Sequence, residues 1–289
     1  MSQKKAVIYM VLAAILWSTA GMLIKLVSLH PMAIAGIRSG IAAIVMLPFV
    51  RINKNLFTKN KLLAALFYSL TVILFVNANK LTTSVNAIFL QFTAPIWVAL
   101  FSRWFLKSKI RRSDWVAIIV IFLGMGLFFI DNLSSGRLIG NILGLISGFT
   151  FAGMIVSFKQ QEKGATIGAI FVGNVFNAVL CLPFYFLAIP NTKSLLGLVL
   201  LGVFQVGIAY ILYAKAIEHL TVIEGILIPA LEPILNPVWV LLIIHEVPSS
   251  KAIVGGIIVI SALITRSIYQ TKVNSNNAPH ELTFDTTTT

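Results

Sequence analysis

A series of long apolar runs limits the possible folds of this chain more than any other feature. The hydrocarbon core of a bilayer needs about 20 consecutive apolar residues in helical form. Only 11% of the residues are charged and the mean hydropathy is +0.95, whereas about a quarter of a soluble domain is charged. The sequence therefore predicts an all-α integral membrane protein with about ten transmembrane helices, at about 6–27, 32–50, 62–79, 85–106, 115–130, 138–158, 165–189, 193–217, 222–244 and 252–269.

The distribution of positive charge predicts the orientation of these helices. The formal net charge of +13 would by itself also suit a nucleic-acid-binding protein. The Lys and Arg residues lie in short stretches between the apolar runs, however, where the positive-inside rule puts them. With the N-terminus inside, sixteen of the 22 fall on the inner side, five on the outer side and one, Arg38, within a span. We expect a multi-pass protein of the cell membrane with both termini in the cytoplasm, membrane lipid around it and no nucleic-acid partner.

The two halves of the chain align with each other at an offset of 138 residues. At this offset Pro95 aligns with Pro233, and Asn86 aligns with Glu224. Several apolar and threonine positions match at the same offset, which indicates an internal repeat. Each half holds five expected spans, an odd number, so the second copy would cross the membrane in the opposite sense. Inverted repeats of this kind are common in secondary transporters, which bind the substrate near the midplane.

The repeat suggests where the domains begin and end. A first five-helix repeat would cover residues 1–131, and a second would cover 138–269. The linker between them, DNLSSGR, is a cluster of turn-forming residues. The polar segment 270–289 reads as a disordered cytoplasmic tail.

Residues 224–240 combine features that a lipid-facing helix does not tolerate. Three prolines recur there at intervals of four residues, and each removes a backbone donor and displaces the carbonyl four residues back. Glu232 lies among them, although a carboxylate at mid-helix costs about 2.5 to 3.5 kcal/mol even on the lenient insertion scale. Irregular backbone at this depth is tolerated only beside protein or a water-filled cavity. We interpret the segment as the wall of a polar pocket, with helix flexing expected at Pro95, Pro229, Pro233 and Pro237.

Short motifs in both halves point to a known family. The first half has the pattern A-x-x-W at Ala14–Trp17 and then Arg38, and the second half has HEVPSSKAIVGG with Glu246. With these residues and its two proline-bearing helices, the chain resembles the EamA family of the drug/metabolite transporter superfamily over about residues 6–269. It departs from the family pattern at Ser108, where the first copy lacks the acid. The resemblance implies an inner-membrane permease with a central cavity, often an exporter of amino acids or other small metabolites.

Buried polar and aromatic side chains are the candidate cavity residues. Glu232 is the strongest candidate, because its counterpart Ala94 shows that the fold does not require an acid there. Burial favours the neutral form of a carboxyl group, so proton carriage is one hypothesis and a structural carboxyl is the alternative. Arg38 can hold a substrate carboxylate or pair with an internal acid. The other predicted cavity residues, each with ordinary packing as its alternative, are Glu224, Asn86, Gln91, Gln205, Asn236, Trp17, Phe92, Tyr210 and Tyr213.

A stripe of small residues is expected to pack closely against another helix. Gly140, Gly144, Gly148 and Ala152 recur every four residues and therefore share one face of a helix. Small residues on one face let two membrane helices approach closely. We interpret this stripe as a packing surface.

The motifs that the sequence lacks narrow the possible functions. It has no P-loop, no H-E-x-x-H zinc motif and no G-x-S-x-G elbow, and its four histidines lack metal-ligand spacing. We expect no cofactor, no metal site and no enzymatic activity. The preferred function is a secondary carrier, an exporter of a small metabolite such as an amino acid or amine, with alternating access and with proton or other ion coupling as a hypothesis. An intramembrane enzyme, and a channel, receptor or assembly subunit, are the alternatives.

Overall fold

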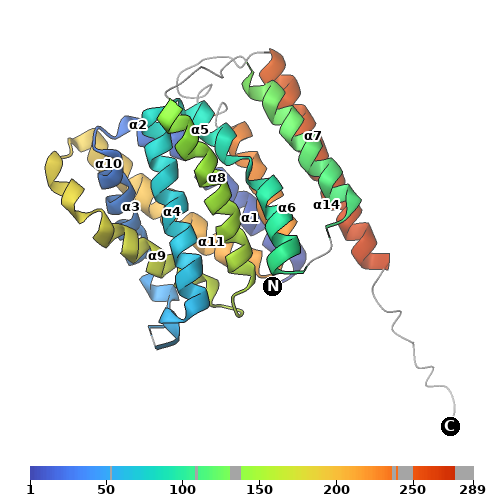
Figure 1. Cartoon of the computed structure of the whole chain (residues 1–289), viewed down its shortest axis with the longest axis horizontal. Helices are drawn as coiled ribbons and strands as arrows, with labels where there is room; N and C mark the ends of the chain where they lie inside the picture. The colour runs from blue at the N-terminus through green and yellow to red at the C-terminus, as the bar shows by residue number, and fades with distance from the viewer. Residues whose placement is uncertain (53, 108–109, 131–137, 236–238, 240–249, 277–289) are drawn as a thin grey trace, which may run out of the picture.

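The computed structural model describes residues 1–52, 54–107, 110–130, 138–235, 239 and 250–276. These residues form helices joined by short connections, with no strand among them (Figure 1). In the first half the helices are α1 (Gln3–Trp17), α2 (Ala20–Leu26), α3 (Pro31–Met46), α4 (Lys59–Leu81), α5 (Ser84–Gln91), α6 (Ala94–Phe105) and α7 (Arg112–Phe129), with 3-10 turns η1 (Leu47–Phe49) and η2 (Lys54–Phe57).

The second half has a similar series of helices with more irregular turns. These elements are α8 (Leu138–Lys159), α9 (Thr166–Leu180), the 3-10 segment η3 (Leu182–Leu187), α10 (Thr192–Leu200), the π-helix η4 (Leu201–Ile208), α11 (Ala209–Ile217), α12 (Val222–Leu227), the 3-10 turn η5 (Ile228–Ala230), a helical stretch at 231–235, and α14 (Ser250–Asn276). The last helix continues to Asn276, beyond the point at which we expected the final span to end.

Many of these helices are long and apolar enough to cross a membrane. Six stretches of the described chain meet that description: Gln3–Leu26, Pro31–Phe49, Lys59–Leu81, Asn86–Phe105, Leu138–Lys159 and Thr192–Ile217. Two shorter apolar helices, Thr166–Leu180 and Ile253–Arg266, accompany them. The chain is thus a multi-pass helical membrane protein. The predicted total of ten spans stays a prediction.

Two spans in the first half are broken near their middle. The first breaks between α1 and α2, where the Ser18 and Thr19 hydroxyls donate to carbonyls three residues earlier at 2.6 and 2.7 Å. The fourth breaks between α5 and α6, next to Pro95, which stands in the first turn of α6. These breaks matter for function because they put loose backbone and helix ends inside the bundle, where a solute can use them.

Glycines bring α8 into close contact with α4 and α5. A Cβ atom added at Gly148 would lie 2.8 Å from the carbonyl oxygen of Gln91, and one added at Gly140 would lie 2.7 Å from the backbone nitrogen of Thr82. Real Cβ atoms do not come this close to backbone atoms. The predicted packing role of the small stripe is therefore confirmed at these positions.

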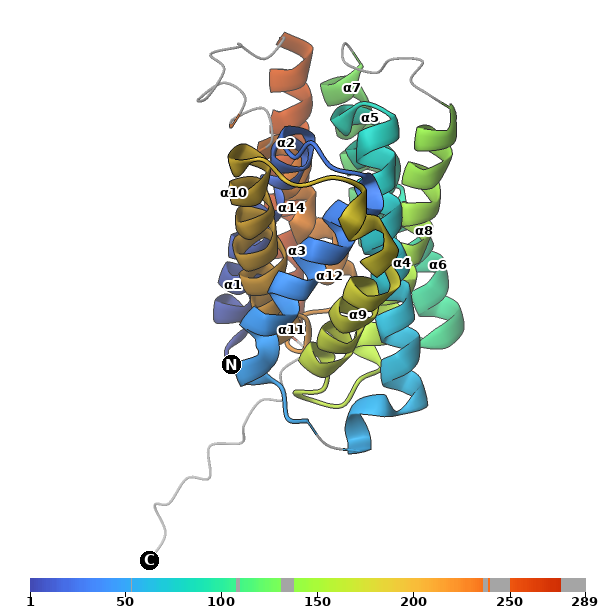
Figure 2. The same ribbon diagram turned by 90° about the vertical axis from the view of Figure 1, so that its left-hand side faces the viewer.

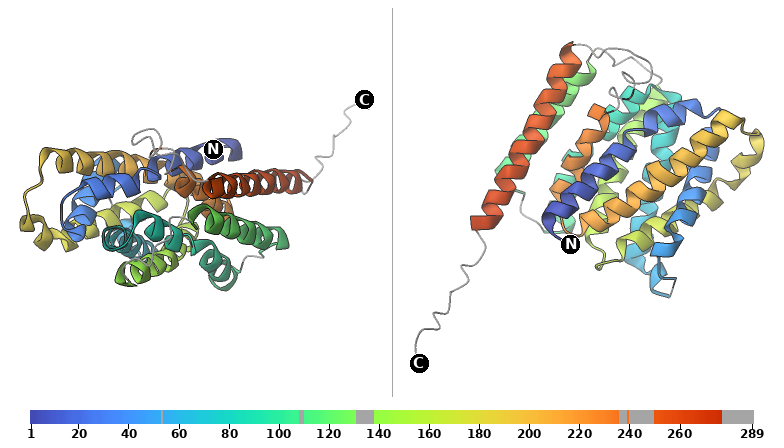
Figure 3. Two further views of the ribbon diagram at one scale, coloured as in Figure 1. Left: turned by 90° about the horizontal axis from the view of Figure 1, so that it is seen from above. Right: turned by 180° about the vertical axis from the view of Figure 1, so that it is seen from behind.

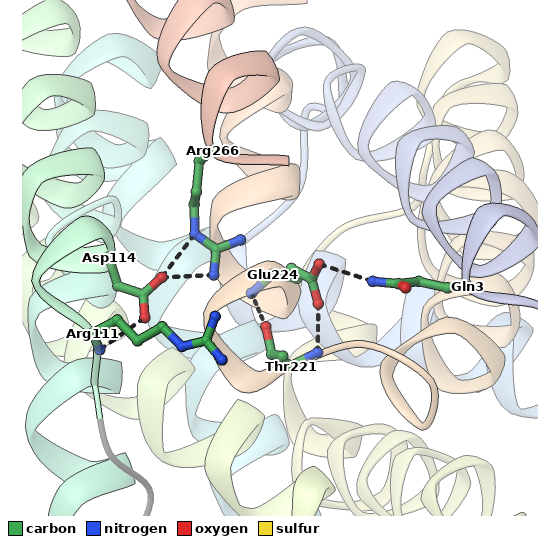
Figure 4. Close-up of polar contacts among 6 residues, drawn as sticks. All are labelled: Gln3, Arg111, Asp114, Thr221, Glu224 and Arg266. Atoms are coloured by element: carbon green, nitrogen blue, oxygen red, sulfur yellow. Dashed lines mark hydrogen bonds and ion pairs between the residues drawn. The ribbon is translucent and has the colours of Figure 1, made fainter. Parts of the chain in front are cut away.

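Helices α7 and α14 form a pair that lies beside the other helices (Figures 1 and 3). A buried ion pair joins them: Arg266 Nη2 and Nε donate to Asp114 Oδ1 at 2.8 and 3.1 Å (Figure 4). The other carboxylate oxygen of Asp114 accepts from the backbone N–H of Arg111 at 3.1 Å. Because Asp114 belongs to the first half and Arg266 to the second, this contact ties together the last described helices of the two halves.

The remaining helices form a bundle in which the two halves interleave. Helix α4 packs on α8 and α9, α3 packs on α9 and η4, and α1 packs on α11. Figure 2 shows α3, α9 and α4 crossing in front of one another, with α1 and α10 beside them. The start of α1 and the end of α14 lie at the same end of the molecule (Figure 1). The interior of the bundle is therefore lined by residues from both halves.

Candidate substrate pocket

A small polar cavity lies where helices of both halves meet. Its volume of about 40 Å³ gives room for one or a few water molecules and no larger solute. Six of the predicted cavity residues line it: Trp17, Arg38, Gln91, Gln205, Tyr210 and Glu232. The other lining residues, which the sequence did not single out, are Thr71, Val72, Phe75, Phe151 and Val206.

Arg38 enters the cavity from α3 and is almost fully buried, with 2% of its surface exposed. Its Nη1 donates to Oε1 of Gln205 at 3.1 Å. Gln205 belongs to the π-helix η4, and such wide turns are often found at functional sites. Within the described part of the chain, the Nε–H of Arg38 has no acceptor and no acid forms an ion pair with the guanidinium. This cation therefore retains an unused donor beside the cavity.

Glu232 reaches the same cavity from the helical stretch that follows η5. The predicted interruption is present here, because α12 ends at Leu227 and Pro229 stands in a 3-10 turn. Only 7% of Glu232 is exposed, and it makes no hydrogen bond or ion pair with any residue that the structure describes. A carboxyl and a guanidinium thus share one cavity without pairing with each other.

Aromatic rings form one wall of the cavity around Trp17. Its ring centroid lies 4.8 Å from that of Tyr210 and 6.4 Å from that of Phe151. Tyr210 in turn contacts Tyr68 at 4.9 Å, and the Tyr68 hydroxyl donates to Asn174 at 2.9 Å. The indole N–H of Trp17 is buried and has no acceptor among the described residues. The wall therefore adds a second unused donor to that of Arg38.

A chain of small polar groups forms another part of the lining. Gln91 donates from Nε2 to the Ser147 hydroxyl at 2.8 Å, and that hydroxyl donates to the carbonyl of Thr71 at 3.3 Å. The Thr71 hydroxyl also lies 3.1 Å from that of Thr150. Sequence reasoning did not identify Thr71, because a hydroxyl in an apolar helix carries no signal that separates a cavity residue from a packing residue.

Two predicted cavity residues lie at helix starts, outside the cavity. Glu224 caps α12: its carboxylate accepts from the backbone N–H of Thr221 at 2.7 Å, and Gln3 lies 3.5 Å from its other oxygen (Figure 4). Asn86, in the first turn of α5, donates to Asn141 Oδ1 at 3.2 Å. Both positions are buried, but their polar atoms face a neighbouring helix end.

Two aromatic candidates also lie outside the cavity. Phe92 faces a separate small apolar space beside Pro95. Tyr213 is fully buried and donates from its hydroxyl to the carbonyl of Gly225 at 3.3 Å, so it supports α12 from behind. Pro233 is buried in the stretch 231–235. Two further predicted residues, Asn236 and Pro237, lie outside the described residues.

The cavity holds reactive partners for a charged solute and none for a metal. Arg38 and Trp17 offer free N–H donors, whereas Glu232 offers free acceptor oxygens or, if protonated, one donor. Among the residues that the structure describes, no group of three or more His, Cys, Asp or Glu side chains is placed to hold a metal ion. The arrangement therefore suits reversible binding by hydrogen bonds and charge.

The interleaved membrane helices and the internal polar cavity define a membrane transport protein. The sequence signature of the EamA-like transporter family matches residues 4–130 and again residues 138–267. The chain therefore belongs to the EamA-like transporter family. The double match also agrees with the similarity that we found between the two halves of the sequence.

Related proteins support the same class. The chain is 25% identical to an uncharacterized transporter of Clostridium kluyveri over 94% of this chain and 96% of that protein. It is 26% identical to the uncharacterized transporter YwfM of Bacillus subtilis, over 94% and 97% respectively. The pseudopaline exporter CntI of Pseudomonas aeruginosa is 25% identical over 63% of this chain and 65% of its own length. A solved crystal structure shares the fold, with a TM-score of 0.76 at 15% identity over 94% of this chain and 99% of the other.

Proposed function

We propose that this protein is a secondary carrier that exports a small zwitterionic or amine metabolite, such as an amino acid, by alternating access. The observation that carries the proposal is the pair of opposite charges in one buried cavity. A buried ionic group is costly unless it is paired or meets water. Arg38 and Glu232 are buried and do not pair with each other, so a function that requires both is the simplest reason to keep them.

The chemistry of the cavity favours a ligand with two charged ends. A substrate carboxylate fits Arg38 and the indole N–H of Trp17, both of which have a free donor. A substrate ammonium fits Glu232, and the rings of Trp17 and Tyr210 are suited to a cation or an apolar side chain. An uncharged sugar would leave both charges unpaired, which makes it a poorer candidate.

The size of the cavity supports a carrier cycle. At about 40 Å³ it is too small for a metabolite, so the structure corresponds to a closed conformation. Binding requires the helices to separate and close again around the substrate. The breaks beside Trp17, at Pro95 and at Pro229 provide points at which such movement needs few backbone hydrogen bonds to break.

The orientation and the coupling ion complete the proposal. We place both termini in the cytoplasm and regard 1–131 and 138–269 as inverted repeats, with the cavity at their junction. Glu232 would carry a proton in exchange for substrate, because a carboxyl without a protein partner is free to bind either. The exporter direction is supported by the name of the Pseudomonas aeruginosa relative.

Transport by purified protein in liposomes tests the proposal. A thermal-shift screen of amino acids and amines on the solubilised protein first selects a substrate. A carrier then shows saturable counterflow of the labelled substrate, a channel shows conductance instead, and an enzyme converts the substrate into a product. Conductance without counterflow, or chemical conversion, would rule out the carrier.

A further inference from the structure

Two contacts at opposite ends of the bundle join the halves of the chain in the same way. At one end, Gln3 of α1 donates from Nε2 to Oε1 of Glu224 on α12 at 3.5 Å. At the other end, Asn86 of α5 donates from Nδ2 to Oδ1 of Asn141 on α8 at 3.2 Å. Gln3 and Asn141 are 138 positions apart, and so are Asn86 and Glu224. Each contact is therefore the other one with the two halves exchanged.

The helix caps around the two contacts repeat as well. The hydroxyl of Thr83 accepts from the backbone N–H of Asn86 at 3.1 Å, and the hydroxyl of Thr221 accepts from the backbone N–H of Glu224 at 3.2 Å. Thr83 and Thr221 are again 138 positions apart. The two contacts thus stand on the same structural element, the first turn of a helix whose start is fixed by threonine.

A lysine supports each of these helix starts from the neighbouring span. Lys25 donates to the carbonyl of Thr82 at 2.9 Å, and Lys159 donates to the carbonyl of Leu220 at 2.8 Å. Thr82 and Leu220 are also separated by 138 positions. Each lysine stands near the end of a span and fixes the connection that precedes a contact. The repetition extends to backbone partners, which makes chance pairing of surface side chains a poor explanation.

The cavity lies between the two contacts. Gln3 is the first residue of the span Gln3–Leu26, and Lys25 stands near its other end. At 1.5 Å per residue, the two ends of this span lie about 33 Å apart. Trp17, which lines the cavity, stands between them, about 21 Å from the Gln3 end. A solute can leave the cavity toward either end of the bundle only if the halves separate there.

We propose that the Gln3–Glu224 and Asn86–Asn141 contacts are two latches that decide toward which side of the membrane the cavity opens. The inference rests on the proposed carrier function and adds the residues that control its two exits. Opening one exit separates the halves at that end and breaks one latch, while the other latch stays closed. Water that enters the opened end then takes the place of the lost hydrogen bonds.

The two latches differ in strength. Asn141 accepts from the Thr82 hydroxyl at 2.8 Å as well as from Asn86, whereas the described side chains give Gln3 only the 3.5 Å contact with Glu224. The Gln3–Glu224 latch should therefore open more easily. In the proposed orientation it faces the cytoplasm, so the protein would rest with its cavity more accessible from that side.

A labelling experiment with one engineered cysteine tests the latches. The single native cysteine, Cys181, is changed to Ser, and the cavity residue Val72 is changed to Cys. A membrane-impermeant maleimide is added to one side of proteoliposomes, and an N-terminal tag reports which side is which. Asn141→Ala should raise the labelling rate from the side opposite the tag, and Gln3→Ala should raise it from the tag side. The loss of one or two neutral hydrogen bonds predicts a change of about two- to tenfold in each case.

Matched variants separate the latches from general loosening. Asn77 bonds only within its own half, to the Ile73 carbonyl at 2.8 Å and to Met32, so Asn77→Ala should leave both rates unchanged. Gln160→Ala, an exposed change at the same end as Gln3, should do the same. Gln3→Glu keeps the side-chain length and puts a second carboxylate against Glu224, so it tests the tag-side latch even if an alanine variant fails to fold.

The outcomes distinguish the latches from the function on which they rest. If the latch variants and their controls label equally in a parent that performs counterflow, the latches are wrong and the carrier stands. If both latch variants raise labelling from the same side, the assignment of one latch to each exit is wrong. If the parent performs no counterflow at all, the proposed function fails and the latch proposal fails with it.

Discussion

The change Glu232→Gln is the most direct test of the cavity, because it removes the charge and keeps the shape of the side chain. Two unit charges 4 Å apart attract each other by about 4 kcal/mol at an effective dielectric constant of 20. The Gln oxygen still accepts a hydrogen bond from a substrate ammonium, which contributes about 1 kcal/mol. The net loss of about 2 to 3 kcal/mol corresponds to a roughly 30- to 150-fold weaker affinity.

Counterflow in proteoliposomes measures this loss as a rise in KM for a labelled amino acid selected by the thermal-shift screen. Glu162→Gln is the matched control, because Glu162 is an exposed carboxylate in the connection between α8 and α9. It should leave KM unchanged. A substrate analogue without its ammonium group adds a second control, since it should bind the parent and the Glu232→Gln variant equally weakly.

The reasoning would be refuted by a Glu232→Gln protein whose KM lies within twofold of that of the parent. Proton coupling is tested in the same vesicles with an imposed pH gradient. The parent should respond to the gradient, and the variant should not. Normal transport by Glu232→Gln at every pH would show that this carboxyl binds neither the substrate nor the proton.

Further changes test other parts of the structure. Arg38→Gln should weaken a substrate that carries a carboxylate by about tenfold or more and affect a plain amine little, as KM values measure. Gly140→Ala should lower the thermal midpoint, because its Cβ would meet the backbone of Thr82, whereas Gly126→Ala, with nothing within 4 Å, should not. Asp114→Asn should destabilise the α7–α14 pair by about 3 kcal/mol in denaturant unfolding, since it leaves the buried Arg266 unpaired; equal stability would show that water reaches that guanidinium.

Much of the candidate site could be predicted from sequence because the membrane makes polarity informative. Charged residues within apolar runs are costly in lipid, so Arg38 and Glu232 had to face protein or water. Both line the cavity, together with Gln91 and Gln205. The interruption at Pro229 followed from the missing backbone donor of proline. In these cases one residue and its depth in the membrane contain the whole argument.

Other residues show where this reasoning ends. Glu224 and Asn86 satisfy the same rule, yet their side chains serve helix starts and contacts between the halves. Thr71 and Phe151 line the cavity without any distinguishing pattern. The break between α1 and α2, which sets the direction of Trp17, has no proline to announce it and depends on the Ser18 and Thr19 hydroxyls.

The sequence by itself thus determined that the chain enters the membrane many times, that its halves are related and that its interior holds unpaired charge. Hydropathy and charge are properties of each residue and its depth, so they can be read along one dimension. Only the tertiary structure decided which polar side chains meet in the cavity and which join the two halves at the ends. That choice depends on how each helix is rotated and broken, and the packing of helices distant in the chain fixes both.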